Sequence, residues 1–265
     1  MVYIILFGSY ARGDFVEYDE TAVNDGQYIE TFQSDLDLLV IVANEKVEKD
    51  FKLWKQIEEE INRKTTTPVD LIVHNVQFVN EQLSHGVPFF LDIKKEGIVL
   101  LNRGKMKLVN ARKLAPDERK EIAEKDLERW MTKGRDFYEV YKYLKGGIES
   151  TPNRLNLAVF NLHQATEHFF IAIQLVFTCY NPKGHDIHKL SNIVGHFGFD
   201  IHDIFPQDND EEKYLFELLR RSYVDARYSS SFSISEKELE ILVKRVQRIG
   251  TEIEKLCRKR IAEMT

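Results

Sequence analysis

The hydrophobic periodicity of the chain changes once, and this change constrains the fold more than any other feature. Before about residue 103, short continuous apolar runs alternate with a charged stretch whose apolar residues recur every three or four positions. After Pro116 the period is helical almost to the end. Short apolar runs are typical of buried strands, whereas the wider spacing is typical of amphipathic helices. The sequence therefore predicts an α+β protein, with a mixed β-sheet and flanking helices at residues 1–108 and an antiparallel helical bundle at residues 109–265.

Within the first part, the apolar runs predict buried strands at residues 2–7, 36–42 and 69–73, with one more short strand at 97–101. The charged stretch over residues 43–65 predicts one helix. Residues 14–18 and 27–32 flank Asn24-Asp25-Gly26, and an Asp-Gly pair is a strong hairpin signal. We therefore expect a β-hairpin between the first two buried strands.

Helix-start signals divide the second part of the chain. They occur at Pro116, where two acidic residues follow, at Thr151-Pro152, and at Ser235-Glu236-Lys237-Glu238, which forms a capping box. Two breaks between helices are indicated, one at Gly146-Gly147 and one over the segment 181–184. Four or five helices are expected in this bundle.

Composition narrows the class of protein. The net charge is −6, so the basic surplus of a duplex-DNA binder is missing and no duplex DNA is expected as a partner. No apolar run approaches the roughly 20 residues that cross a bilayer, and the apolar start is too short for a signal peptide. Cys179 and Cys257 lack metal-ligand spacing and are expected to be reduced thiols. These features favour a cytoplasmic protein without membrane contact.

Three short motifs in the first part carry chemically useful groups. The first, Gly8-Ser9, directly follows the first expected strand, and Arg12 lies just beyond it. Backbone N–H groups beside a glycine can bind phosphate oxygens, although a Gly-Ser pair at a strand end is also a common plain turn. Arg12 is either a phosphate or structural partner or an exposed loop arginine.

The other two motifs supply carboxylates. Asp35 and Asp37 alternate with leucines at the start of the second strand, so both project from one face. Two such acids repel each other unless a cation lies between them, and Mg²⁺ prefers oxygen ligands of this kind. Asp70 is the single charge in the third strand and would be costly to bury without a partner. The alternatives are solvated acids at a strand end and an ordinary strand-start aspartate.

Together, these motifs resemble the polymerase β-like nucleotidyltransferases, in the minimal branch that includes kanamycin-type aminoglycoside nucleotidyltransferases. The resemblance covers about residues 1 to 100. It implies an enzyme in which Gly8, Ser9 and Arg12 bind the triphosphate of an NTP, with ATP the expected substrate. It also implies that two Mg²⁺ ions are held by catalytic carboxylates, namely Asp35, Asp37 and Asp70. Asp70 would in addition help to deprotonate the hydroxyl of an unknown small-molecule or protein acceptor.

The chain departs from this family pattern in two places. The gap between Ser9 and Asp35 is longer than usual because of the expected hairpin. In the family a helix usually precedes the first strand, whereas here that strand opens the sequence. Both departures bear on how complete the nucleotide pocket is.

The second part of the chain resembles a HEPN domain over about residues 120 to 260. Three segments carry this resemblance: the helix expected at 160–167, the His185-Asp186-x-x-x-Leu190 segment and the Tyr223-x-x-Ala-Arg-Tyr segment. The resemblance implies dimerisation through HEPN helices. A polar pocket for a nucleotide or phosphate is one interpretation, and interhelical bonding is the other. The residues concerned are His185, Lys189, Tyr223, Arg227 and Tyr228.

Several functions remain open at this point. Many HEPN proteins are ribonucleases with an arginine followed by a histidine after four to six residues, and no arginine of this sequence has a histidine there. The expected function is Mg²⁺-dependent transfer of an NMP, with AMP the expected group, to a hydroxyl. The alternatives are an aminoglycoside nucleotidyltransferase and an antitoxin-like nucleotide-binding module without turnover.

Overall fold

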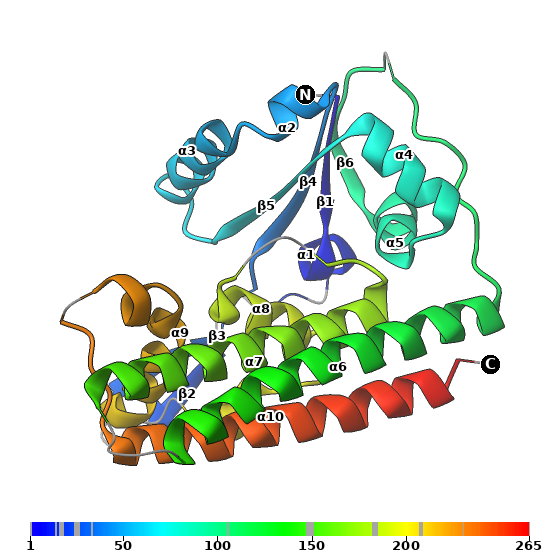
Figure 1. The fold of residues 1–265 in the computed structure, drawn as a ribbon. Helices are drawn as coiled ribbons and strands as arrows, with labels where there is room; N and C mark the ends of the chain where they lie inside the picture. Colours follow the sequence, from blue (N-terminus) through cyan, green and yellow to red (C-terminus); the bar gives the residue numbers. More distant parts are fainter. Residues whose placement is uncertain are drawn as a thin grey trace. The chain divides into compact units, whose positions relative to one another are not determined.

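In a computed structural model, the chain divides into two compact units, Met1–Leu114 and Ala115–Thr265 (Figure 1). The boundary lies within the basic, loop-like segment that separates the two hydrophobic patterns. The structure describes residues 2–13, 15, 19–23, 27–32, 34–104, 106–146, 151–181, 185–206, 209–229 and 231–264. Side chains of residues 16–33 and 145–150 are outside this description.

The first unit is built on a mixed sheet of four described strands in the order β5-β4-β1-β6. These strands are β1 (Tyr3–Phe7), β4 (Leu36–Val42), β5 (Val69–Asn75) and β6 (Ile98–Asn102). β4 runs parallel to β5, and β1 runs antiparallel to both β4 and β6. All four expected strands are present, each within one or two residues of the predicted limits.

Helices cover both faces of this sheet. On one face, Trp54 of α3 (Phe51–Asn62) packs with Val40 and Val42, and its indole N–H donates to the Val47 carbonyl at 2.7 Å. Contacts to the opposite face come from α4 (Val76–His85) and α5 (Pro88–Glu96). The expected single helix over 43–65 is wrong in detail, because α2 (Glu45–Glu48) ends before Asp50 caps a separate α3.

The hairpin is present as β2 (Asp19–Val23) and β3 (Gln27–Phe32), which pair antiparallel. Its first strand begins at Asp19, so the expectation of a strand over residues 14–18 is wrong for the residue described there, Phe15. The expected turn at Asn24-Asp25-Gly26 lies outside the described residues. A short helix, α1 (Gly8–Arg12), follows β1 directly and ends at Gly13, which has a φ of 80°.

The second unit is a helical bundle with five described α-helices (Figure 1). These are α6 (Pro116–Gly146), α7 (Pro152–Thr178), α8 (Ile187–Gly195), α9 (Asp210–Tyr228) and α10 (Glu236–Ala262), with a 3₁₀ turn, η1, at Ile201–Asp203. The three expected helix starts are confirmed: α6 begins at Pro116, Thr151 caps α7, and Ser235 with Glu238 forms a capping box.

α7 is the central helix of the bundle and contacts α6, α8, α9 and α10. Its middle is buried on nearly every side, which suits its apolar composition. The helix ends at Cys179, where the Arg119 guanidinium donates to the carbonyls of Val176 at 2.9 Å and Phe177 at 2.7 Å. These donations satisfy carbonyls that a helix end leaves without intrahelical partners.

Two further expectations concern the whole chain. Cys179 and Cys257 are both free thiols, and burial raises the pKa of Cys257 to about 12. Across the described segments, the structure contains no helix both long and apolar enough to pass through a membrane.

Candidate functional site

The parallel pairing of β4 with β5 places two of the three expected carboxylates side by side. Asp37 lies directly opposite Asp70 in the register, and the Leu36 N–H donates to the Pro68 carbonyl at 2.8 Å just before it. Neighbouring strands are about 4.8 Å apart, and residues opposite each other project from the same face. Asp35, two positions before Asp37, comes just before the strand begins.

Gly8 allows the chain to pass close to this carboxylate pair. β1 pairs with β4 so that Phe7 lies opposite Asp37, and Gly8 follows with a φ of 74°. A Cβ atom at residue 8 would lie 2.3 Å from Oδ2 of Asp37, which is closer than atoms can approach without displacement. Both the backbone conformation and the close approach therefore require glycine at this position.

Asp37 occupies an unfavourable electrostatic environment. Burial raises the pKa of Asp37 to about 7, together with the negative charges of Asp70 and Asp35, while the positive charge of Arg12 opposes the shift. All four side chains therefore lie within electrostatic reach of one another. A bound cation would relieve this repulsion, because an opposite charge favours the ionised carboxylate.

The fit of this site to Mg²⁺ rests on its donor chemistry. Carboxylate oxygens are the hard ligands that Mg²⁺ takes, usually one or two per ion with substrate phosphates and water completing the shell. Among the residues that the structure describes, no three His, Cys, Asp or Glu side chains are grouped closely enough to hold a metal. A site sharing its ion with a triphosphate is compatible with this arrangement, and the three-carboxylate ligand set stays a prediction.

The remaining residues of the phosphate motif lie in α1. Ser9 is buried, whereas Arg12 is exposed near the end of the helix and acts on Asp37 through its charge. N–H groups in the first turn of a helix have no intrahelical acceptor, so they can donate to an oxygen outside the helix. The structure thus brings together all six expected residues of the first unit: Gly8, Ser9, Arg12, Asp35, Asp37 and Asp70.

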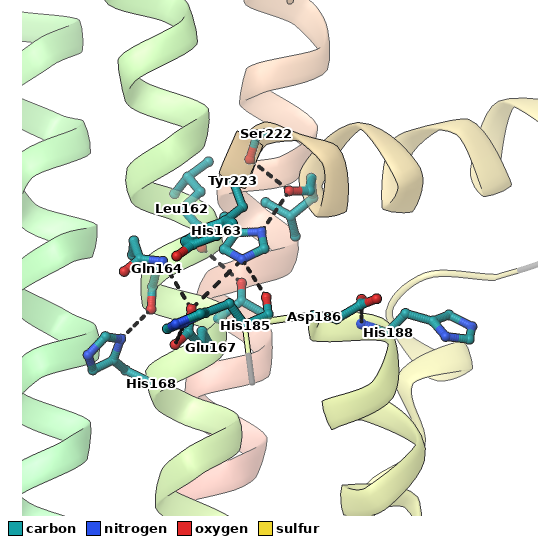
Figure 2. A network of polar contacts seen from close by, with 12 residues as sticks. Leu162, His163, Gln164, Glu167, His168, His185, Asp186, His188, Ser222 and Tyr223 are labelled. Atoms are coloured by element: carbon teal, nitrogen blue, oxygen red, sulfur yellow. Dashed lines mark hydrogen bonds and ion pairs between the residues drawn. The ribbon is translucent and has the colours of Figure 1, made fainter. Parts of the chain in front are cut away.

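A second group of polar residues lies within the helical unit, centred on His163 of α7 (Figure 2). His163 is fully buried, and its ring nitrogens lie 3.0 Å from the Leu219 carbonyl oxygen and 3.1 Å from the His185 carbonyl oxygen. Burial lowers the pKa of His163. Its ring therefore ties α7 to α9 and to the segment before α8, a structural role.

Glu167 joins this buried group to the surface. Its Oε1 lies 2.9 Å from Nδ1 of the exposed His185, and its Oε2 accepts from the Gln164 amide at 3.0 Å (Figure 2). The same Oε2 lies 3.9 Å from Nε2 of His163. A carboxylate with 4% exposure is costly to bury, and these polar neighbours offset that cost.

Aromatic stacking arranges most of the expected HEPN pocket residues. The Tyr223 ring stacks on His185 with centroids 5.0 Å apart, and the guanidinium of Arg227 lies 4.5 Å from the Tyr223 centroid and 5.0 Å from that of Tyr228. Tyr228 is 76% exposed. Lys189 is exposed on α8. The stack has both the cation and the aromatic faces that a nucleotide could use, although a purely interhelical role uses the same contacts.

Sequence reasoning missed Glu167 as the residue that connects His163 with His185. The available signal was its position in α7, an acid four residues after a histidine within the most apolar helix of the unit. His168, the next residue along α7, has a separate environment. It is half-buried, lies 2.7 Å from the Gln164 carbonyl oxygen through Nδ1, and packs beside Trp130 and Phe137.

Comparison with known proteins concerns the helical unit. Residues 127–256 match the family model described as HEPN domain. No curated protein matches the chain at a significant level. The matched residues run from within α6 to within α10, so they include both the His163 group and the Tyr223 stack. The second unit of this chain therefore contains a HEPN domain, at residues 127–256.

Proposed function

We propose that the chain is a Mg²⁺-dependent nucleotidyltransferase that moves an NMP, with AMP the expected group, from an NTP to a hydroxyl. The observation that carries the proposal is the environment of Asp37. This carboxylate lies beside Asp70 in the strand register, against Gly8, and its pKa is raised to about 7 by burial and by two neighbouring acids. Perturbed groups of this kind gather at functional sites.

Each residue has a defined part in this proposal. Gly8 and Ser9 bind triphosphate oxygens through backbone N–H groups, and Arg12 adds positive charge. Asp35, Asp37 and Asp70 would hold the two Mg²⁺ ions, and Asp70 would also help to take the proton of the attacking hydroxyl. Mg²⁺, when bound, stabilises the attacking and leaving oxygens. The hydroxyl oxygen then forms a bond to the α-phosphorus as the bond to pyrophosphate breaks.

The acceptor is the open part of the proposal. A small molecule and a protein hydroxyl both fit the chemistry, and an aminoglycoside is one member of the first class. We assign the HEPN domain a supporting part, in which the stack of His185, Tyr223, Arg227 and Tyr228, with Lys189 nearby on α8, helps to bind nucleotide or acceptor. Pairing of HEPN helices into a dimer is the second way in which this domain could contribute.

The decisive experiment incubates the purified protein with α-labelled ATP, Mg²⁺ and host lysate, and identifies the labelled product. We expect transfer with the natural chain and a loss of at least about a hundredfold with Asp35→Asn combined with Asp37→Asn, because removal of metal ligands removes the main source of catalysis. The matched control is Asp126→Asn. Asp126 is half-buried with a pKa raised mainly by burial, but it lies in the helical unit.

The outcomes separate the candidate functions. Transfer that persists in the double variant contradicts the assignment of the site. ATP binding without transfer to any component supports the regulatory module instead. RNA degradation that survives the double variant would revive a ribonuclease function for the HEPN domain.

A further inference from the structure

The strand that carries Asp70 lies at an edge of the sheet. β5 ends the order of the four described strands, where β4 is its neighbour. The Pro68 carbonyl accepts from the Leu36 N–H of that neighbour at 2.8 Å. Successive residues of an extended chain direct their hydrogen-bonding groups to alternate sides, so the N–H and C=O of Val69 point away from β4. These groups need partners outside the ladder, because Val69 is buried.

Asn62, the last residue of α3, bonds to both of these groups. The Val69 N–H donates to Oδ1 of Asn62 at 2.7 Å, and Nδ2 of Asn62 donates to the Val69 carbonyl at 3.1 Å. A single side-chain amide thus acts at this residue as a neighbouring strand would. Water could bond to either group in place of the amide, but it would not join α3 to β5.

The helix that carries Asn62 is itself anchored on β4. Trp54 of α3 packs with Val40 and Val42 of that strand. The same strand carries Asp37. Asn62 therefore connects the start of β5 with β4 by a route through α3, in addition to the ladder between the two strands.

The residue that Asn62 binds directly precedes Asp70, which lies opposite Asp37 in the register. A carboxylate moves with its backbone, so a displacement of Val69 changes the position of Asp70 relative to Asp37. The groups of a functional site have to be held within about 0.5 Å of the productive geometry. A misplacement of about 1 Å can cost about a hundredfold in rate. The two bonds at Val69 therefore bear on the carboxylate pair itself.

We propose that Asn62 is a positioning residue for the carboxylate site, which fixes Val69 and through it holds Asp70 beside Asp37. The inference rests on the proposed function, because that function assigns Asp70 to the metal. Asn62 itself touches neither nucleotide nor metal. Replacing a residue that orients a metal ligand typically costs about 10- to 100-fold in metal affinity or activity.

Asn80 of α4 provides a matched control in the same unit. The Val109 N–H donates to Oδ1 of Asn80 at 2.9 Å, and Nδ2 of Asn80 donates to the Lys107 carbonyl at 3.3 Å. Asn62→Ala and Asn80→Ala should both lower the melting temperature of the full chain, since each loses two hydrogen bonds. Only Asn62→Ala should weaken Mg²⁺ binding, by about tenfold. Calorimetric titration of the full chain with Mg²⁺ alone measures this binding without turnover.

The transfer assay with α-labelled ATP separates positioning from a general loss of folded protein. At a temperature well below both melting transitions, Asn62→Ala should raise the Mg²⁺ concentration for half-maximal transfer about tenfold. Excess Mg²⁺ should then restore much of the rate. A loss of folded protein would instead lower the rate by the same factor at every Mg²⁺ concentration. Asn80→Ala should show the Mg²⁺ dependence of the natural chain.

A double variant tests whether the effect passes through Asp70. When Asp70→Asn has already removed the carboxylate, Asn62→Ala should weaken Mg²⁺ binding no further, because residues that act through one another are not additive. A full tenfold loss in that background, as in the natural one, would overturn the inference by showing that Asn62 acts on the fold in general.

The remaining outcomes distinguish this inference from the proposed function. A natural chain that neither binds Mg²⁺ nor transfers nucleotide overturns the proposed function, and the role of Asn62 with it. A natural chain that does either, with Asn62→Ala no different from Asn80→Ala in Mg²⁺ affinity and Mg²⁺ dependence, overturns the role of Asn62 alone.

Discussion

Gly8 combines a left-handed backbone conformation with a close approach to the side chain of Asp37. Gly13 has a similar φ of 80°, yet a Cβ atom there would meet nothing within 4 Å. The two glycines therefore separate two effects that usually occur together. One is the strain that any side chain introduces at positive φ, and the other is the displacement of a carboxylate that the proposed chemistry uses.

The first prediction compares alanine at these two positions. Gly13→Ala should cost about 1 kcal/mol of folding free energy from backbone strain and leave nucleotide transfer within about twofold. Gly8→Ala should cost at least as much and also lower transfer by about tenfold or more, because its Cβ displaces Oδ2 of Asp37. Thermal melts and a labelled-ATP assay measure the two quantities. Equal losses of transfer in both variants would show that proximity to Asp37 is irrelevant.

The second prediction concerns the pH dependence of stability. Burial raises the pKa of Asp37 to about 7 in the folded protein, against an ordinary value of 3.8 for an aspartate in the unfolded chain. As the pH rises between these values, the unfolded chain loses the proton before the folded protein does. The stability of the natural chain therefore falls across this window and remains lower above pH 7.

Asp37→Asn removes this penalty. At pH 8 with a chelator present, the variant should be more stable than the natural chain by on the order of 2 kcal/mol, and the difference should vanish near pH 3. Added Mg²⁺ should raise the melting temperature of the natural chain and leave that of the variant almost unchanged. Denaturant titrations at several pH values measure this. A variant less stable than the natural chain at pH 8 would contradict the assignment of Asp37 as an unfavourably placed acid.

At the scale of elements, close packing of α6 and α10 against α7 depends on two glycines. A Cβ on Gly134 of α6 would lie 2.4 Å from Cε1 of Phe169, and one on Gly250 of α10 would lie 2.9 Å from Cε2 of the same ring. The phenyl ring of Phe169 on α7 thus lies between α6 and α10, and each of these helices has a glycine where it faces the ring. Glycine is otherwise unfavourable inside helices by about 1 kcal/mol relative to alanine.

The third prediction follows from this geometry. Gly134→Ala should destabilise the helical unit by about 1–3 kcal/mol, since the added methyl group displaces a packed ring. Gly195→Ala is the control, because Gly195 ends α8 with open space around its Cβ position. It should be neutral or slightly stabilising. Urea unfolding followed by circular dichroism gives both values, and Phe169→Leu should reduce the cost of Gly134→Ala if the ring is its cause.

At the scale of the whole molecule, two hydrophobic cores position two separate groups of functional side chains. The first unit holds Asp37, Asp70 and Gly8 through the register of its own strands. The helical unit holds His163 and Glu167 through its own core, which includes Leu162 and Phe170. Each group therefore lies within a single unit.

The sequence by itself determined the features that depend on neighbouring residues. Strand positions followed from short apolar runs, and the starts of α6, α7 and α10 followed from their capping residues. The division into a sheet unit and a helical unit followed from the change in period. Prediction was wrong at the start of β2 and at the break between α2 and α3, where Asp50 caps a new helix within a continuous helical pattern.

Only the tertiary structure decided which distant residues meet. The sequence placed Asp35 and Asp37 on one face, but the pairing of Asp37 with Asp70 depends on the register between β4 and β5. The need for glycine at residue 8 likewise depends on how closely β1 approaches Asp37. Local propensity acts over a few residues, whereas register and close contact are set by packing between segments far apart along the chain.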